Sequence, residues 1–186
     1  RKAATFKYSK YIIGYGFALV LVLLVGIAVL GVRQMAAINH EMQALVEQQN
    51  VKTSLAFTMY SAARDRALLL HAMTLSNDAF EQDEQYMLFN AKATDFTLAR
   101  TQWLAMPSGA EEMGIMDLQG KLIITAGAVQ LRVADTIRSG RIKEANRMLL
   151  HEGIPIQNKV LDTLTQLINL QQQASRRVTE QAAREY

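Results

Sequence analysis

Hydrophobic and polar residues follow two different patterns along this chain. Residues 11–32, YIIGYGFALVLVLLVGIAVLGV, contain no charged side chain. From residue 33 onward, apolar residues recur every three or four positions between polar ones, which is typical of amphipathic helices. No stretch alternates apolar and β-branched residues with polar ones between turn signals, as strands do. The sequence therefore predicts an all-α fold that begins with one uniformly apolar helix.

The apolar segment 11–32 is long enough to cross a membrane. At about 1.5 Å per residue, its 22 residues span roughly 33 Å as a helix, against about 30 Å for a hydrocarbon core. A signal peptide has a shorter apolar core, about 7 to 15 residues, which ends at a small-residue cleavage site. We interpret 11–32 as a retained transmembrane helix; a cleaved export signal and a buried core helix are the alternatives.

The distribution of charge predicts the orientation of this helix. Residues 1–10 carry no acidic residue and four basic ones, Arg1, Lys2, Lys7 and Lys10. Basic residues favour the cytoplasmic side, so 1–10 is expected to be a cytoplasmic tail and 33–186 to lie in the periplasm. Of the chain's 20 Lys and Arg, the other 16 lie in 33–186 with all 17 acidic residues. That balance argues against a nucleic-acid partner.

Residues 33–186 divide into four long amphipathic helices with short connections. The expected helices cover about 33–75, 79–105, 110–138 and 155–186. Such helices form an antiparallel, up-down-up-down four-helix bundle. In that topology the last helix returns to the side from which the first one came, so a second membrane span after Tyr186 is expected.

Capping signals set the predicted helix ends. Asp78 with Glu81 resembles a capping box at the start of the second helix, and Ser108 with Glu111 has the same spacing before the third. Ser139-Gly140 predicts the end of the third helix. A short helical piece follows and is expected to stop at Gly153, and Pro155 suits the start of the last helix.

Three basic residues on the first helix are the candidate ligand-binding residues. Lys52 and Arg66 interrupt its apolar seam, and Arg64 lies close by. A buried cation is costly unless it is paired. These residues therefore either form structural ion pairs with carboxylates such as Asp65, or they bind an anionic ligand or partner at a pocket or subunit interface, if the register of the seam is correct.

Catalytic and metal-binding motifs are absent from the sequence. The chain has no cysteine, which excludes disulfides and thiolate metal sites. Its histidines, His40, His71 and His151, lack the spacing of a zinc motif, and no Gly-rich phosphate loop follows a strand. We expect no enzyme active site, no metal and no cofactor in these residues.

Two stretches of the chain resemble a known family. SAARDRALLLHAMTLSNDAFEQDEQYMLFNAKATDFTLAR and IRSGRIKEANRMLLHEGIPIQNKVLDTLTQLINLQQQ are similar to the four-helix-bundle sensory ectodomains of bacterial transmembrane receptors. These receptors include methyl-accepting chemotaxis proteins, sensor histidine kinases and membrane-bound cyclic-di-GMP enzymes. The family has no fixed binding signature to carry over by residue, so Arg64, Arg66 and Lys52 remain predictions from the helix pattern.

The resemblance implies a sensor that transmits signals across the bacterial inner membrane. Its implied partners are the membrane, a second copy of the chain in a homodimer, and either a small anion or a periplasmic binding protein. The cyclic-di-GMP, kinase and chemotaxis types of output all remain open. The alternative from another class is a membrane-anchored helical scaffold or auxiliary subunit that binds another protein.

Overall fold

The structure, a computed structural model, describes the backbone of residues 3–184 and the side chains of residues 19, 21–35, 43, 45–177 and 180. Every element in this described part is helical, which confirms the all-α prediction. The first helix, α1, covers Ala3–Leu75. The chain forms two compact units, Arg1–Val46 and Glu47–Tyr186, which are described separately.

In the first unit, the described side chains are mostly exposed and apolar. Residues 19 and 21–35 are all exposed, among them Leu19, Val22 and Leu30. Residues 11–18 and 20 of the predicted membrane span, and the basic tail 1–10, lie outside the described side chains. Where side chains are described, no helix has both the length and the hydropathy that crossing a membrane requires.

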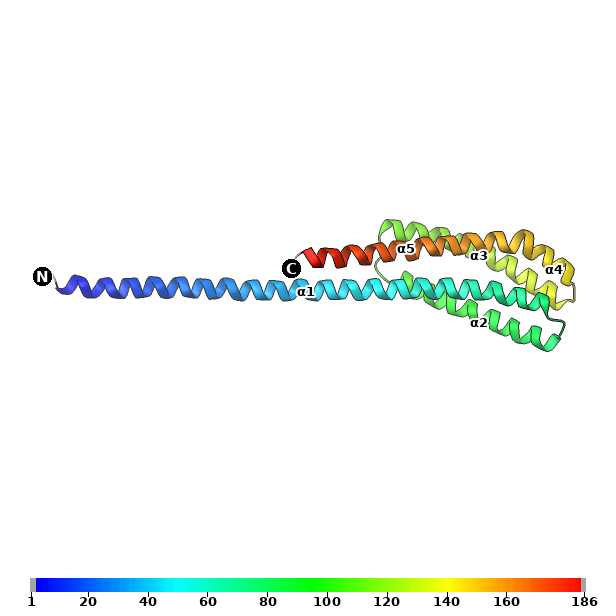
Figure 1. The fold of residues 1–186 in the computed structure, drawn as a ribbon, viewed down its shortest axis with the longest axis horizontal. Coiled ribbons are helices and arrows are strands. Elements are labelled where there is room, and N and C mark those ends of the chain that lie inside the picture. The colour runs from blue at the N-terminus through cyan, green and yellow to red at the C-terminus, as the bar shows by residue number, and fades with distance from the viewer. Residues whose placement is uncertain (1–2, 185–186) are drawn as a thin grey trace. The chain divides into compact units, whose positions relative to one another are not determined.

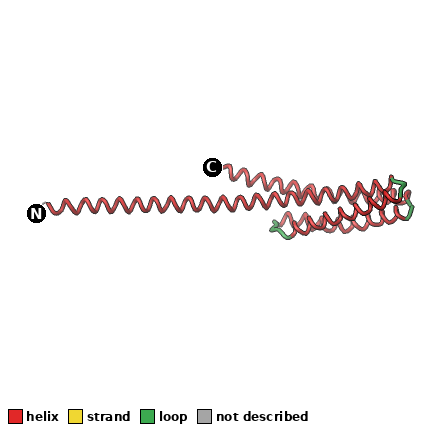
Figure 2. Tube along the Cα trace, turned by 90° about the horizontal axis from the view of Figure 1, so that it is seen from below, coloured by secondary structure: helices red, strands yellow, loops and turns green. Residues whose placement is uncertain are grey.

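In the second unit, helices run alternately up and down. After α1 come α2 (Ala79–Leu104), α3 (Ala110–Arg138), α4 (Ile142–Met148), the π-helix η1 (Leu149–Gly153) and α5 (Ile154–Arg184) (Figure 1). The loops after α1 and after α3 lie at one end of this unit and the α2–α3 loop at the other (Figure 2). The C-terminal part of α1, α2, α3 and the run from α4 to α5 therefore form an antiparallel bundle.

The cap at the start of α2 differs from the predicted box. Asp78 is the N-cap and its Oδ1 accepts the N–H of Phe80 at 2.9 Å. Glu81 does not reach back to the N–H of Asp78, as a capping box requires. Ser76 takes that place, because its hydroxyl accepts from Asp78 at 3.1 Å and donates to Glu81 at 2.7 Å.

The predicted cap of α3 is wrong by one residue. The N-cap is Gly109, whose N–H donates to Oε2 of Glu112 at 2.9 Å. Ser108 instead donates to the carbonyl of Met106 and accepts from Lys52. The end of α3 is as predicted: Gly140 has φ of 75°, and the N–H groups of Gly140 and Arg141 donate to Ile137 and Thr136, which is a Schellman motif.

The predicted helix stop at Gly153 is also wrong. Residues 142–184 are continuously helical, and the π-helix η1 connects α4 to α5. The N–H of Ile154 bonds to the carbonyl of Leu149, five residues back. Pro155 follows directly; it has no N–H, and its ring would crowd the carbonyl of a regular preceding turn. A wide turn before Pro155 relieves that crowding without ending the helix.

The core of this unit consists of two clusters. The first cluster contains residues of α1, α2, α3 and α5. Its members are Ala56, Met59, Ala62, Ala63, Phe96, Ala99, Trp103, Met116, Ala126, Val160, Leu164, Leu167 and Ile168. The second lies towards the α1–α2 turn and comprises Leu70, Met73, Phe89, Val129, Val133, Ala134, Ile137, Ala145 and Leu149. On α3, Leu118 is exposed and the neighbouring Gln119 is buried.

Candidate functional site

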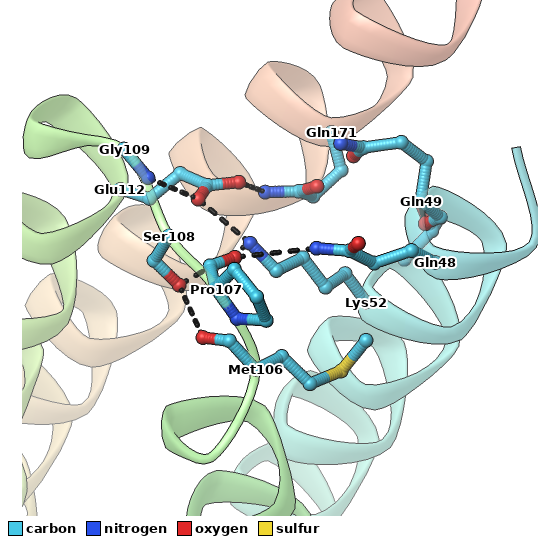
Figure 3. Close-up of polar contacts among 10 residues, drawn as sticks. Gln48, Gln49, Lys52, Met106, Pro107, Ser108, Gly109, Glu112 and Gln171 are labelled. Carbon is cyan, nitrogen blue, oxygen red and sulfur yellow. Dashed lines mark hydrogen bonds and ion pairs between the residues drawn. The ribbon is translucent and has the colours of Figure 1, made fainter. Parts of the chain in front are cut away.

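Lys52 lies buried in the middle of a polar cluster at the end of the bundle near the α2–α3 loop (Figure 3). Its side chain is 1% exposed. The Nζ atom donates to Oε2 of Glu112 at 2.7 Å and to the hydroxyl of Ser108 at 3.2 Å. The ammonium also lies 4.7 Å from the centre of the Trp103 ring. The sequence-predicted cation is therefore held by a structural ion pair.

Glu112 links Lys52 to α5 and to the start of α3. Its Oε1 accepts a hydrogen bond from Nε2 of Gln171 on α5, and its Oε2 also accepts the N–H of Gly109. Burial alone would raise the pKa of the Glu112 carboxyl, but the hydrogen bonds from Gln171, Lys52 and Gly109 lower it below its ordinary value. One carboxylate thus ties α1, α3 and α5 together at a single level of the bundle.

Several polar atoms around this ion pair have no hydrogen-bond partner among the described residues. They are Oε1 of Gln49, Oε1 of Gln171 and Nε1 of Trp103. Gln48 donates to the carbonyl of Pro107 at 3.4 Å and adds a link between α1 and the α2–α3 loop. The cluster is therefore rich in contacts between helices, but its hydrogen bonding is incomplete.

Arg66 lies elsewhere, against Phe89 of the second core cluster. The residue is 9% exposed, its guanidinium carbon lies 4.0 Å from the centre of the Phe89 ring, and its Nε has no partner in the described structure. Burial lowers the pKa of Arg66 from its ordinary value to about 10. The side chain has an aromatic ring against it and no carboxylate within ion-pair distance among the described residues.

Replacing Arg66 with Met is expected to raise the free energy of unfolding by about 1 kcal/mol. The lowered pKa corresponds to roughly 3 kcal/mol against the charged form, and a desolvated cation–π contact returns about 2 kcal/mol of this. Methionine has a similar length and can contact Phe89 through sulfur. Urea unfolding followed by circular dichroism measures the change.

The exposed Arg147 on α4 provides the control for this substitution. Arg147→Met should leave the free energy of unfolding within about 0.5 kcal/mol of the parent, as exposed changes usually do. A fall in stability on replacing Arg66 would mean that its charge has a stabilising partner.

Arg64 is exposed and lines a pocket. It bonds to the neighbouring Asp65 at 3.1 Å, with its own side chain 54% exposed. The pocket has a volume of about 220 Å³. Its walls come from α1, α3, η1 and α5: Arg64, Ala67, Leu68, Leu70, His71, Gln130, Leu149, Gly153, Ile154, Gln157, Asn158 and Leu161.

The three predicted residues therefore do not form one site. Lys52 is bonded to Glu112, Arg66 lies on Phe89, and Arg64 lines the pocket. The sequence pattern did not predict the role of Glu112, Gln130 and Gln157, whose polar side chains form hydrogen bonds inside the bundle. A signal was present, since glutamines recur at core spacing: Gln119, Gln130, Gln157 and Gln171 are all buried. Among the described residues, no group of three or more His, Asp or Glu is placed to hold a metal ion.

Comparisons with known proteins agree with this architecture. Residues 8–186 match a protein family described as a four helix bundle sensory module for signal transduction. A solved structure described as the periplasmic sensor domain of a sensor histidine kinase has a TM-score of 0.63 and 16% identity, covering 76% of this chain and 95% of that chain. At this identity the likeness shows a shared fold. No curated protein is significantly similar to this chain in sequence.

Proposed function

This chain belongs to the family of four-helix-bundle sensory modules for signal transduction, and we propose that it is the extracytoplasmic sensor of a bacterial receptor in the inner membrane. The observation that carries this proposal is the extent of the match, residues 8–186, which includes the apolar segment 11–32. In this proposal a ligand or a periplasmic binding protein acts on the bundle, and the signal leaves through α1 and α5.

The membrane anchor in this proposal is the segment 11–32. Its 22 uncharged residues are preceded by four basic residues, which supports an N-terminus in the cytoplasm. The exposure of its described side chains, for example Val22 and Ile27, also supports contact with lipid, because large exposed apolar surfaces mark membrane or protein contacts. A second span after Tyr186, an output domain beyond it, and pairing of two copies complete the proposed receptor.

The proposed mechanism is a small sliding or rotation of packed helices, a common way to switch between two states. A ligand drives such a change only if it binds the two states with different affinity. Contacts that tie α1 to α5 would set the balance between these states. The cluster of Lys52, Glu112 and Gln171 is such a contact.

Reporter fusions test the proposed orientation. Alkaline phosphatase, which is active only in the periplasm, should be active when fused after Tyr186 of this chain and inactive when fused before residue 10. Green fluorescent protein fused at the same two positions should show the opposite pattern. It fluoresces only when it stays in the cytoplasm, so the fusion before residue 10 should fluoresce and the fusion after Tyr186 should not.

Charge reversal provides the matched control for this experiment. Changing Arg1, Lys2, Lys7 and Lys10 to Glu should reduce phosphatase activity of the Tyr186 fusion several-fold, since basic residues set orientation. If the fusion before residue 10 has phosphatase activity and the fusion after Tyr186 has none, the bundle lies in the cytoplasm and the proposed function is overturned.

A further inference from the structure

A separate pocket of about 370 Å³ lies between α2 and α3. The charged residues that line it are Arg100 on α2 and Asp117 and Lys121 on α3. None of the three belongs to an ion pair in the described part of the chain. The pocket therefore carries two positive charges and one negative charge that no described ion pair neutralises.

The guanidinium of Arg100 is fixed across the two helices. Its Nε donates to Oε1 of Gln119 at 2.9 Å, and its Nη2 donates to the carbonyl of Met116 at 3.4 Å. The other N–H groups of Arg100 have no partner among the described residues, yet no nitrogen of Arg100 is a buried, unpaired atom. These N–H groups are therefore accessible to a ligand in the pocket that Arg100 lines.

Gly120 provides the space that this guanidinium occupies. A Cβ at residue 120 would lie 2.7 Å from Nη2 of Arg100, closer than a real Cβ approaches another atom. Inside a helix, glycine is less favourable than alanine. Gly127 lies seven residues further along α3, and a Cβ there would have no heavy atom within 4 Å. The missing side chain at residue 120 thus lets Arg100 lie over the backbone of α3.

The two cations of the pocket favour a ligand with an anionic group. A carboxylate matches the planar guanidinium of Arg100, because it can accept two parallel N–H bonds. The exposed Lys121 lines the same pocket and adds positive charge. A carboxylate of the ligand is therefore expected at Arg100.

The remaining polar groups of the pocket are hydrogen-bond acceptors. The hydroxyls of Thr97 and Thr101 donate to the carbonyls of Ala93 and Thr97 at 2.8 and 2.9 Å, so only their lone pairs remain for a ligand. The carboxylate of Asp117 also accepts hydrogen bonds, and it repels a second acidic group. These groups favour a ligand with one carboxylate and an O–H group.

Apolar side chains and the volume of the pocket define the body of the ligand. The buried Phe96 and the half-buried Ile123 line the pocket together with Ile124, which is 75% exposed. An apolar cavity of about 150 Å³ holds one benzene molecule. By the same proportion, 370 Å³ takes about fifteen non-hydrogen atoms, enough for one ring with a short side chain.

We infer that the pocket between α2 and α3 binds a hydroxyaryl monocarboxylate. The carboxylate contacts Arg100, the ring lies against Ile123 and Ile124, and the hydroxyl donates to the acceptors of the pocket. This inference rests on the proposed sensory function and specifies a ligand class and its place in the bundle.

Isothermal titration calorimetry on chain 1–186 in detergent micelles, with titrations into empty micelles subtracted, tests the ligand class. 3-(4-Hydroxyphenyl)propanoate carries both polar groups and is expected to bind. 3-Phenylpropanoate lacks the hydroxyl, 3-(4-hydroxyphenyl)propanamide lacks the charge, and 3-(4-carboxyphenyl)propanoate has a second carboxylate in place of the hydroxyl. Each of these three should bind about tenfold more weakly, because each leaves a polar group of the pocket unpaired or repelled.

Two glycine variants of α3 connect this binding to the pocket. Gly120→Ala keeps Arg100 but displaces its guanidinium, so it should weaken binding of 3-(4-hydroxyphenyl)propanoate about tenfold. Gly127→Ala is the matched control and should leave binding unchanged. Alanine favours the helix in both, so circular dichroism should show no loss of helicity. Arg100→Gln removes the charge and should weaken binding by a similar factor; it decides the question if Gly120→Ala loses helicity.

Absence of binding by 3-(4-hydroxyphenyl)propanoate would overturn the inference, as would equal binding of the amide. Binding that is unchanged by both Gly120→Ala and Arg100→Gln would place the ligand elsewhere and overturn it too. The proposed function still stands after any of these outcomes if the phosphatase fusions report a periplasmic bundle, because orientation is measured independently of the pocket.

Discussion

Replacing Glu112 with Gln is expected to lower the free energy of unfolding by about 3–5 kcal/mol. The substitution removes the carboxylate that neutralises Lys52 at 2.7 Å and leaves a cation that is 1% exposed. Removing one partner of a buried ion pair costs this much because the other charge stays buried and uncompensated. Glutamine keeps the size of the side chain, but its single oxygen can replace only one of the two carboxylate oxygens that accept from Gln171 and from Gly109. Urea unfolding of chain 1–186 in a mild detergent measures the loss.

The partner variants separate charge from shape. Lys52→Met leaves Glu112 with its hydrogen bonds from Gln171 and Gly109, so it should cost less than Glu112→Gln. The double variant Lys52→Met/Glu112→Gln removes both charges and should recover most of the loss, since a buried pair can often be replaced by neutral residues at little cost. Additive losses in the double variant would contradict the assignment of an ion pair.

Acid should reduce the difference between the parent chain and Glu112→Gln. Burial raises the pKa of Glu112, but hydrogen bonds from Gln171, Lys52 and Gly109 lower it overall. A carboxyl whose pKa is lower in the folded state stabilises the fold above its unfolded value, near 4.3. That stability disappears as the pH falls through the lower folded value. The same unfolding experiment at pH 7, 5 and 3 should show the two proteins converging below about pH 4.

The helix pattern predicted the bundle because its signals are local. Spacings of three and four residues identify a buried face, and on α1 the apolar residues Ala56, Met59 and Leu70 lie in the core. Cap positions were less predictable, because several nearby residues can satisfy the same N–H group. At α2 the hydroxyl of Ser76 accepts the N–H of Asp78 in place of the expected Glu81. At α3 the N-cap is Gly109 in place of the expected Ser108, and its N–H donates to Glu112. The π-helix carries no sequence signal beyond Pro155, which is equally compatible with a helix start.

The candidate site was less predictable because its partners come from distant parts of the chain. Lys52 could be identified as a cation on an apolar seam, but its partner Glu112 is 60 residues away. Only the register between α1 and α3 decides whether that carboxylate reaches the ammonium. Likewise, the buried acceptor of Gln130 results from its bond to Gln157 on α5, and spacing along α3 does not show it.

Trp103→Ala is expected to lower the free energy of unfolding by about 3–5 kcal/mol, the range for losing a large aromatic side chain from a core. Trp103 is fully buried in the cluster where α1, α2, α3 and α5 meet, and Lys52 lies over its ring. Alanine therefore removes packing for four helices and leaves the ammonium without its aromatic neighbour.

Trp103→Phe separates packing from polarity at the same position. The indole Nε1 has no hydrogen-bond partner among the described residues, so phenylalanine removes an unpaired buried donor, which offsets part of the lost volume. We expect Trp103→Phe to cost about 1 kcal/mol or less, and Trp103→Ala several times more, in the same urea unfolding measured by circular dichroism. A loss for phenylalanine as large as that for alanine would show that the indole N–H is bonded and stabilises the fold.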